Sequence, residues 1–349
     1  MSSINTSSNN ALYLAYRFAG PSADLIVPAV ALNLVALVGI VLNSTVLMVT
    51  AKSSSLRGSA NFLMALICFC ELVHQIGHTF FLVVVISGIN FVSLFTANLI
   101  LAVNFELFKF NFETSKFKPS IFALNCGLMA MFCAAVDRLF AVLMPFKHSS
   151  ICAKYKFPYL FGHLFICTIY GAFIQYHVLT SAFANAGMPT TGSLADAFQS
   201  DFYQFFIGGL CIISFGCICC YVTIFLIVRL KKSVTQQTNT RLFRSLAIIL
   251  SINIVGYLST FIMIHLFPTI GKMYLSPIRV WQFSLFASIL LNVVAGSNAI
   301  VLFLNSTEYR QLFKKELRAV KEHFFKKNAV QPISTIKVKP NIIQLHPIK

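Results

Sequence analysis

Three side chains suited to metal binding or acid–base chemistry fall close together in the stretch ELVHQIGH: Glu71, His74 and His78. Their spacing places them on one face of a helix. Such a face suits a metal ion or an intramembrane enzyme, but the chain has only 8 histidines and no second group of ligands on a partner helix. We therefore expect no metal site, and we assign His78 to helix packing or to the lining of a ligand cavity.

An acid and a base stand side by side in the stretch CAAVDRLFAVLMPFKH, where Asp137 and Arg138 follow a long apolar run. A charged pair at the end of a membrane helix reaches the aqueous interface, and each charge partly neutralises the other. Two roles are open for this pair. It marks the membrane boundary, or it forms a switch between two states.

The chain carries too few charges for a soluble globule. Of its 349 residues, 57% are hydrophobic and 11% are charged, and the mean hydropathy is +0.79, whereas soluble domains have about 25% charged residues. Apolar segments long enough to cross a bilayer, about 20 residues each, fall at 26–50, 60–86, 118–144, 157–182, 204–230, 242–267 and 279–304. The sequence therefore predicts an all-α membrane protein, a seven-transmembrane helix bundle.

The basic residues favour one orientation of this bundle. With the N-terminus outside, most of the 27 lysines and arginines fall on the cytoplasmic side, and the exceptions are Arg17, Lys109, Lys116, Lys118, Lys272 and Arg279. Basic loops stay in the cytoplasm, so we expect the N-terminus outside and the C-terminus inside. The net charge of +17 forms no single patch with stacking aromatics, so we expect no nucleic-acid partner.

A short amphipathic cytoplasmic helix is predicted after the last span. Asn305 and Glu308 indicate its start, and apolar and basic residues then recur on opposite faces, as in helices that lie on anionic membrane lipid. The predicted division of the chain is an extracellular segment 1–24, a membrane domain 25–305, the amphipathic helix 306–325 and a disordered basic tail 326–349.

The predicted outer loops contain none of the 10 cysteines. A disulfide-stapled extracellular domain is therefore excluded, and we expect the thiols to pack as small apolar groups. Asn5 begins an Asn-Thr-Ser sequon on the outer side, which makes it a candidate glycosylation site.

Three stretches are similar, in order, to a known family: LRGSANFLMALICFCEL, NCGLMAMFCAAVDRLFAVLMP and NAIVLFLNSTEYRQLF. Over residues 25–320 the chain resembles the rhodopsin-type G-protein-coupled receptors and, within them, the nematode serpentine chemoreceptors of the Srsx type. The resemblance implies that Asp137 holds Arg138 in the resting state and releases it toward a heterotrimeric G protein, with Leu139 where other receptors have tyrosine. It also implies that Tyr221 moves toward the arginine on activation.

Glu71 is the only acidic residue deep within a predicted span, so we expect it to have a partner or a proton. The resemblance implies that Asn43 and Asn298 meet at this level. Where Glu71 stands, the family normally has an aspartate that helps to bind sodium in many receptors. Because glutamate is one methylene longer, a sodium ion and a protonated Glu71 both remain open, and we expect no other cofactor.

Several features depart from the family. Ser120 stands where amine receptors carry aspartate, which disfavours a simple amine ligand, and the usual outer disulfide is missing. Residues 89–117 are longer and more apolar than an outer loop should be, so they form a re-entrant hairpin or are translated non-coding sequence. The candidates for lining a ligand cavity are His78, Ser120, Gln175, His177, His265 and Gln282.

The preferred function is a chemosensory receptor of the plasma membrane, including that of sensory cilia, which couples a small-molecule or peptide ligand to a heterotrimeric G protein. We expect no enzyme activity. The alternatives are a transporter or channel, and an inactive member of the family. A transporter predicts several charges along a pathway, but only Glu71 lies deep within a predicted span.

Because spans six and seven lack the family's prolines, helix motion must use Gly256, Gly296 or rigid-body tilting.

Overall fold

The computed structural model describes residues 11–103, 120–193, 196, 202–230, 247–260, 262–264 and 274–328. The helices of membrane-spanning length are α2 (Ala23–Lys52), α3 (Ser59–Ile76) together with α4 (His78–Ile86), α6 (Ser120–Leu143), α8 (Lys156–Ala184), α9 (Phe202–Leu230), the segment Ala247–Ile264, and α11 (Pro277–Asn305). They make 7 spans, so the predicted seven-transmembrane all-α bundle is confirmed.

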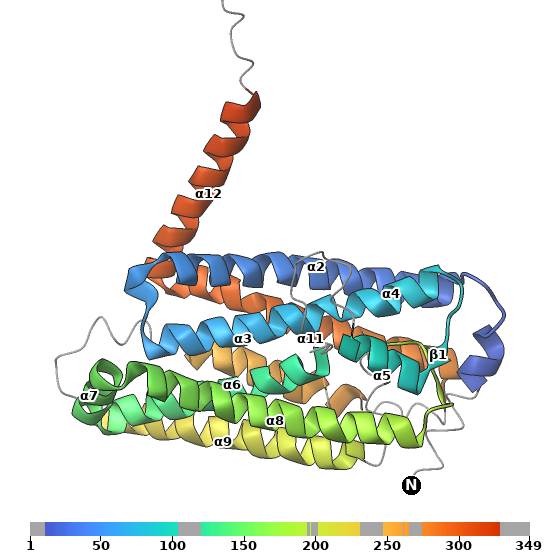
Figure 1. The fold of residues 1–349 in the computed structure, drawn as a ribbon, viewed down its shortest axis with the longest axis horizontal. Coiled ribbons are helices and arrows are strands. Elements are labelled where there is room, and N and C mark those ends of the chain that lie inside the picture. Colours follow the sequence, from blue (N-terminus) through green and yellow to red (C-terminus); the bar gives the residue numbers. More distant parts are fainter. Residues whose placement is uncertain are drawn as a thin grey trace, which may run out of the picture.

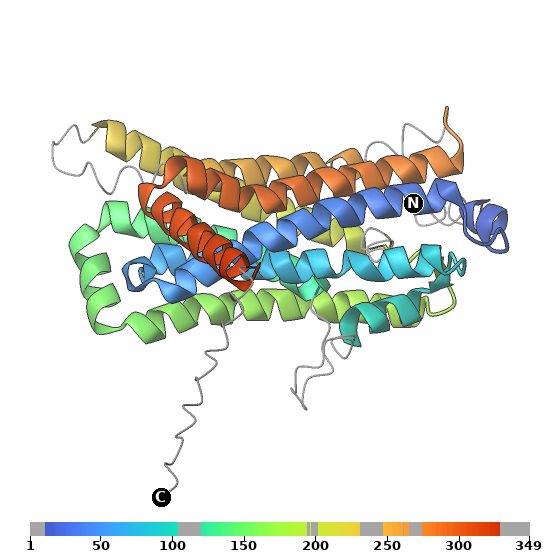
Figure 2. The same cartoon turned by 90° about the horizontal axis from the view of Figure 1, so that it is seen from above.

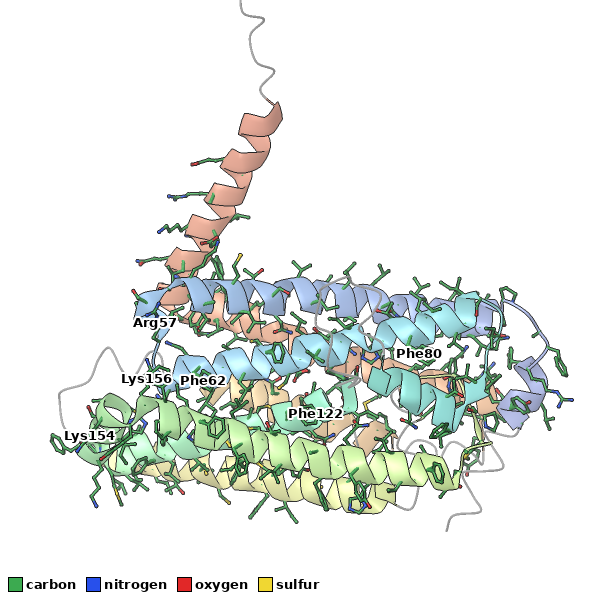
Figure 3. All side chains as sticks on the ribbon, viewed as in Figure 1. Arg57, Phe62, Phe80, Phe122, Lys154 and Lys156 are labelled. Carbon is green, nitrogen blue, oxygen red and sulfur yellow. The ribbon has the colours of Figure 1, made fainter. Side chains whose placement is uncertain are left out.

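The spans run along one common axis (Figures 1 and 2). At one end lies α7 (Pro145–Lys154), and Arg57, Lys154 and Lys156 gather there (Figure 3), so we call it the basic end. A short helix at residues 11–16 lies at the opposite end. This arrangement supports the prediction that the basic end faces the cytoplasm.

The helix α6 forms the centre of the bundle, where it contacts α3, α8 and α9. Small residues such as Ala130 and Cys133 lie on its buried face and let the neighbouring helices approach. Large apolar side chains such as Leu37 on α2 and Phe165 on α8 are exposed instead. The lipid-facing surface is thus apolar, and the polar side chains are left for the interior.

The second span is formed by two helices that meet at Gly77. A Cβ atom at Gly77 would lie 2.3 Å from Ser120 Oγ, so only glycine lets α6 approach the span this closely. Ser120 Oγ also donates to the Val73 carbonyl at 3.5 Å. The segment predicted as one span, 60–86, therefore contains an interruption where α6 crosses it.

At the end opposite α7, β1 (Val92–Ser93) and β2 (Pro189–Thr190) form an antiparallel pair, with Val92 opposite Thr190. After β1, α5 (Leu94–Val103) buries Leu94 and Ala97. Residues 104–117 lie outside the described residues, so the hairpin and the non-coding sequence both stay hypotheses for the segment 89–117. All ten cysteines, every one in the described part of the chain, are free.

The last helix, α12 (Thr307–Asn328), leaves the bundle at the basic end and points away from it (Figure 1). Tyr309 is fully buried, and its hydroxyl lies 3.1 Å from that of Thr50. Lys52 and Glu316 form an ion pair of 2.7 Å. These contacts attach the start of α12 to α2. The predicted domain boundaries at residues 24, 305 and 325 stay predictions.

Candidate functional site

At the basic end, five side chains form the Asp137 cluster: Ser59, Asp137, Arg138, His148 and Tyr159. Asp137 is fully buried. Its Oδ2 accepts hydrogen bonds from Arg138 Nη2 and, at 2.9 Å, from Arg138 Nε. Its Oδ1 lies 3.0 Å from His148 Nε2 and accepts a hydrogen bond of 2.8 Å from the Tyr159 hydroxyl. Both carboxylate oxygens therefore have partners.

The cluster draws its side chains from the ends of α3, α6, α7 and α8. The helix α6 ends at Leu143 because Pro145 cannot continue it, and the same proline starts α7. This turn places His148 against α6, with its ring edge-on to that of Phe140 at a centroid distance of 5.6 Å. A proline-defined turn thus brings a residue of the connecting helix onto the carboxylate.

Ser59 bridges the charged pair. Its hydroxyl lies 3.4 Å from Asp137 Oδ2 and accepts a hydrogen bond of 3.2 Å from Arg138 Nη2. The Arg138 side chain is 14% exposed. Because a buried charge that loses its partner costs several kcal/mol, Arg138 can leave only if other donors keep Asp137 satisfied. His148 and Tyr159 are placed to do this.

Leu139 and Tyr221 lie beside the cluster. Both pack against an apolar group that includes Ala135, Ile213 and Cys217. Of the residues that the resemblance singles out, the structure therefore joins Asp137 and Arg138 by hydrogen bonds. It places Leu139 and Tyr221 in the adjacent contact between α6 and α9.

Sequence analysis missed Ser59, His148 and Tyr159. Their residue type and position could have indicated them, because all three are polar and lie near span ends on the side predicted to be cytoplasmic. Basic residues also border the connection between α9 and the segment Ala247–Ile264, and among them Arg229 has its Cζ 5.8 Å from the centroid of the Phe225 ring. The loop residues Lys231, Lys232, Arg241 and Arg244 lie outside the described residues.

Cys152 on α7 lies beside the cluster, with its Sγ 3.6 Å from His148 Nε2. The order Cys152, His148, Asp137 is similar to that of a cysteine nucleophile with its base. However, burial raises the pKa of the Cys152 thiol, and the charge of Asp137 acts in the same direction. Because the thiolate is the reactive form, these surroundings oppose a nucleophilic role.

A second polar group, the Glu71 cluster, lies midway along the spans. Its members share burial inside membrane-spanning helices, and they are Asn43, Glu71, His74, Gln75, His78, Asn253, Tyr257, Asn292 and Asn298. Glu71 Oε1 accepts a hydrogen bond of 2.5 Å from the Tyr257 hydroxyl. Glu71 Oε2 lies 3.6 Å from His74 Nδ1, which is too far for a hydrogen bond.

Asn43 and Asn298 are joined through the backbone of α11. Each donates to the Ala295 carbonyl, at 3.3 Å and 3.2 Å respectively. Asn43 also donates to Gln75 Oε1 at 3.3 Å, and Asn298 Oδ1 accepts from Asn253 at 2.8 Å. The two asparagines therefore lie at one level, as the resemblance implies, but neither is hydrogen-bonded to Glu71.

Several polar atoms of the Glu71 cluster lack hydrogen-bond partners among the described residues. They are Asn43 Oδ1, Glu71 Oε2, His74 Nδ1, His78 Nδ1, Asn253 Oδ1 and Asn292 Oδ1. His78 Nε2 lies 2.9 Å from Asn292 Nδ2, and the His78 ring is edge-on to that of His74 at 5.1 Å. No three His, Cys, Asp or Glu side chains in the described part of the chain are arranged to hold a metal ion.

The other candidate ligand residues lie apart. Ser120 fits against Gly77, and Gln175 is buried on α8. His177 on α8 is partly exposed, and Gln282 donates to the Asp24 carbonyl at 3.1 Å. His265 and Asn5 lie outside the described residues. Among the candidates that lie in the described part of the chain, the structure therefore brings only His78 into the Glu71 cluster.

The family model of the serpentine type 7TM GPCR chemoreceptor Srsx matches residues 99–317, more than half of the chain. The chain belongs to this family. No curated protein matches it. The Srsx match includes Asp137, Arg138, His148 and Tyr159, and it begins after the second span, which carries Ser59 and Glu71. This chain is thus a multi-pass membrane protein of a receptor family, and not of an enzyme family.

Proposed function

We propose that this Srsx-family protein is a working G-protein-coupled chemoreceptor, in which an extracellular ligand activates a heterotrimeric G protein at the basic end. The supporting observation is the Asp137 cluster. It keeps the Arg138 side chain largely buried, and Tyr159 and His148 stay beside Asp137 when Arg138 is released. A residue that only marked the membrane boundary would need no such set of partners.

In the resting state, Arg138 is held by Asp137 and Ser59. On activation its guanidinium leaves both partners and turns toward the bound G protein. Asp137 then keeps the hydrogen bond from Tyr159 and the contact with His148. These two groups reduce the cost of leaving a buried carboxylate behind, so the resting and active states come close enough in free energy for a ligand to shift them.

The Glu71 cluster connects this change to span six. Tyr257 bonds Glu71 on α3, and Asn253 bonds Asn298 on α11. A tilt of the segment Ala247–Ile264 must change both bonds. A Cβ atom at Gly256 would lie 2.5 Å from Val294, so this segment and α11 are in close contact where they must move relative to each other.

We propose that a proton, rather than sodium, satisfies Glu71. Glu71 Oε2 is buried and has no hydrogen-bond partner among the described residues, so an ionised carboxylate would be costly at this depth. Hard cations take oxygen ligands, whereas a ring nitrogen of His74 lies 3.6 Å from Oε2. A protonated carboxyl group matches these surroundings better.

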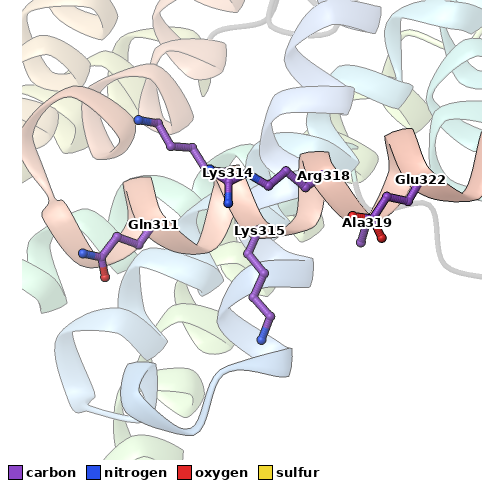
Figure 4. A pocket seen from close by; sticks show the side chains of 6 residues that line it. All are labelled: Gln311, Lys314, Lys315, Arg318, Ala319 and Glu322. Carbon is purple, nitrogen blue, oxygen red and sulfur yellow. The ribbon is translucent and has the colours of Figure 1, made fainter.

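The proposed location is the plasma membrane, including that of sensory cilia, with α12 on anionic lipid. Lys314, Lys315 and Arg318 project around a shallow pocket of α12 that Gln311, Ala319 and Glu322 also line (Figure 4). Basic side chains near an anionic leaflet contribute about 1 kcal/mol each.

The proposed ligand is a small molecule or peptide, and Ser120 in place of an aspartate disfavours a simple amine.

The proposed function is tested by reporter output from several G proteins in cells that express the chain and its Arg138→Ala variant at equal surface level. The matched control is Arg57→Ala, which removes an exposed basic side chain from the same end. Signal that disappears only in Arg138→Ala supports coupling. Signal that persists in this variant contradicts it, and surface-expressed wild type that stays silent under a broad odorant panel favours an inactive family member.

A further inference from the structure

The thiols of Cys133 on α6 and Cys167 on α8 face each other inside the bundle. Their sulfur atoms are 4.0 Å apart, and the two residues are 4% and 1% exposed. Both are free. Formation of a disulfide requires the sulfur atoms to approach to about 2.05 Å, which is a movement of about 2 Å that side-chain rotation and a small helix shift can supply.

The helices α6 and α8 pack closely on the same face as this pair. A Cβ atom at Gly171 would lie 3.0 Å from the Phe122 carbonyl oxygen and 2.5 Å from Cys126 Sγ, so the absence of a side chain lets the two helices approach. Cys126 itself donates to the Cys167 carbonyl at 3.2 Å. Its thiol is therefore directed at the backbone, and Cys133 is the partner that faces the Cys167 sulfur.

A base lies on the same face of α8. His163 precedes Cys167 by one helical turn, and both of its ring nitrogens are buried without a hydrogen-bond partner in the described part of the chain. Its ring is edge-on to that of Tyr159, one turn further, at 4.7 Å. The imidazole interacts with the Cys133 thiol, so it is placed to accept the thiol proton, and a purely structural thiol contact needs no such group.

We propose that Cys133 and Cys167 form an oxidisable dithiol, which hydrogen peroxide converts into a disulfide between α6 and α8. His163 takes the Cys133 proton, and the thiolate attacks one peroxide oxygen. The O–O bond breaks, a sulfenic acid forms, and the departing hydroxide takes the proton from His163 to leave as water. Cys167 then attacks the sulfenic sulfur, its proton joins the leaving hydroxide, and a second water departs. Two thiols are oxidised and one peroxide is reduced.

The test is peptide mapping of the purified full-length receptor after treatment with hydrogen peroxide and alkylation of the remaining thiols. Cleavage after Arg138 and Lys156 separates the two cysteines, so only a disulfide keeps their peptides together. We expect a linked peptide that joins Cys133 to Cys167 and is lost after reduction. Cys167→Ser must abolish it, and Cys126→Ser, which removes a neighbouring thiol on the same α6 peptide, must preserve it.

A second readout is independent of G-protein coupling. The linked receptor should unfold at a higher temperature by the intrinsic fluorescence of Trp281, and dithiothreitol should reverse the shift. If Cys133 and Cys167 stay available to alkylation, or are oxidised singly without a linked peptide, the two thiols only pack and the proposal is wrong. The presence or absence of the linked peptide in the wild-type digest decides between these outcomes even if the serine variants fold poorly.

Discussion

The Asp137 cluster and the Glu71 cluster each bury one carboxylate, but only the first provides partners for both carboxylate oxygens. Asp137 is surrounded by an arginine, a histidine, a tyrosine and a serine from four helices. Glu71 has a single hydrogen bond, from Tyr257, and its second oxygen has none in the described part of the chain. This difference is the basis of the proposal that the bundle holds a charged carboxylate at its end and a protonated one at its centre.

Depth in the bilayer explains this difference. At the end of a span, a carboxylate and a guanidinium reach the interface and stay ionised together. Midway along the spans, Glu71 has one hydrogen bond among the described residues, from Tyr257, and burial disfavours the charged form of a carboxyl group, which is the basis of the proposal that Glu71 carries a proton. We therefore expect the two clusters to respond differently when one partner is removed.

The largest loss of stability is expected from packing of the Glu71 cluster. A Cβ atom at Gly39 would lie 2.1 Å from Gln75 Nε2. Gly39→Ala should displace Gln75 and break its contacts with Asn43 and the Asn292 carbonyl, at a cost of about 3 kcal/mol. Thermal unfolding of the purified protein measures it. Gly208→Ala is the control because, among the described residues beyond its own turn of helix, no atom lies within 4 Å of its Cβ position, and equal effects would contradict the packing.

Removal of one tyrosine hydroxyl should lower the free energy of unfolding by different amounts in the two clusters. Tyr257→Phe leaves Glu71 without a donor and should cost about 2 kcal/mol, whereas Tyr159→Phe leaves Asp137 with Arg138 and His148 and should cost about 1 kcal/mol. Both variants are compared by thermal unfolding in the same detergent. In a Glu71→Leu background the effect of Tyr257→Phe should shrink. A larger loss for Tyr159→Phe would reverse the comparison.

Alkylation of Cys152 reports on the Asp137 cluster. Because burial raises the pKa of this thiol, its labelling rate by a water-soluble maleimide should reach half of its maximum at a higher pH than the rate of an exposed thiol does. Asp137→Asn removes a charge that raises this pKa and should speed labelling several-fold at pH 8. Peptide mapping with a Cys152→Ser control identifies the site, and an unchanged rate would place Cys152 outside the cluster's influence.

Sodium should have the smallest effect. If Glu71 carries a proton, the unfolding temperature should be the same in sodium chloride and in choline chloride, for wild type and for Glu71→Gln alike. A sodium-dependent rise that is present in wild type and lost in Glu71→Gln would show that the ion binds at this carboxyl group instead.

Sequence alone predicted the spans because the bilayer imposes their length, and seven apolar runs therefore indicated seven helices. It also paired Asp137 with Arg138, since the two are neighbours in the chain. The partners that other helices contribute could not be predicted, because nothing in the sequence says which helix faces pack against each other. Tyr257, for example, reaches Glu71 across 186 positions, and Gly77 marks a helix interruption only once Ser120 is seen against it.

The most direct test of the account is basal nucleotide exchange by a heterotrimeric G protein on the purified receptor in lipid nanodiscs. Asp137→Asn removes the charge that holds Arg138, so exchange should rise by about tenfold. Asp137→Asn combined with Arg138→Ala should abolish the increase, because the freed arginine would be absent. Exchange that is unchanged in the single variant, or that stays high in the double variant, would contradict the claim that Asp137 restrains Arg138.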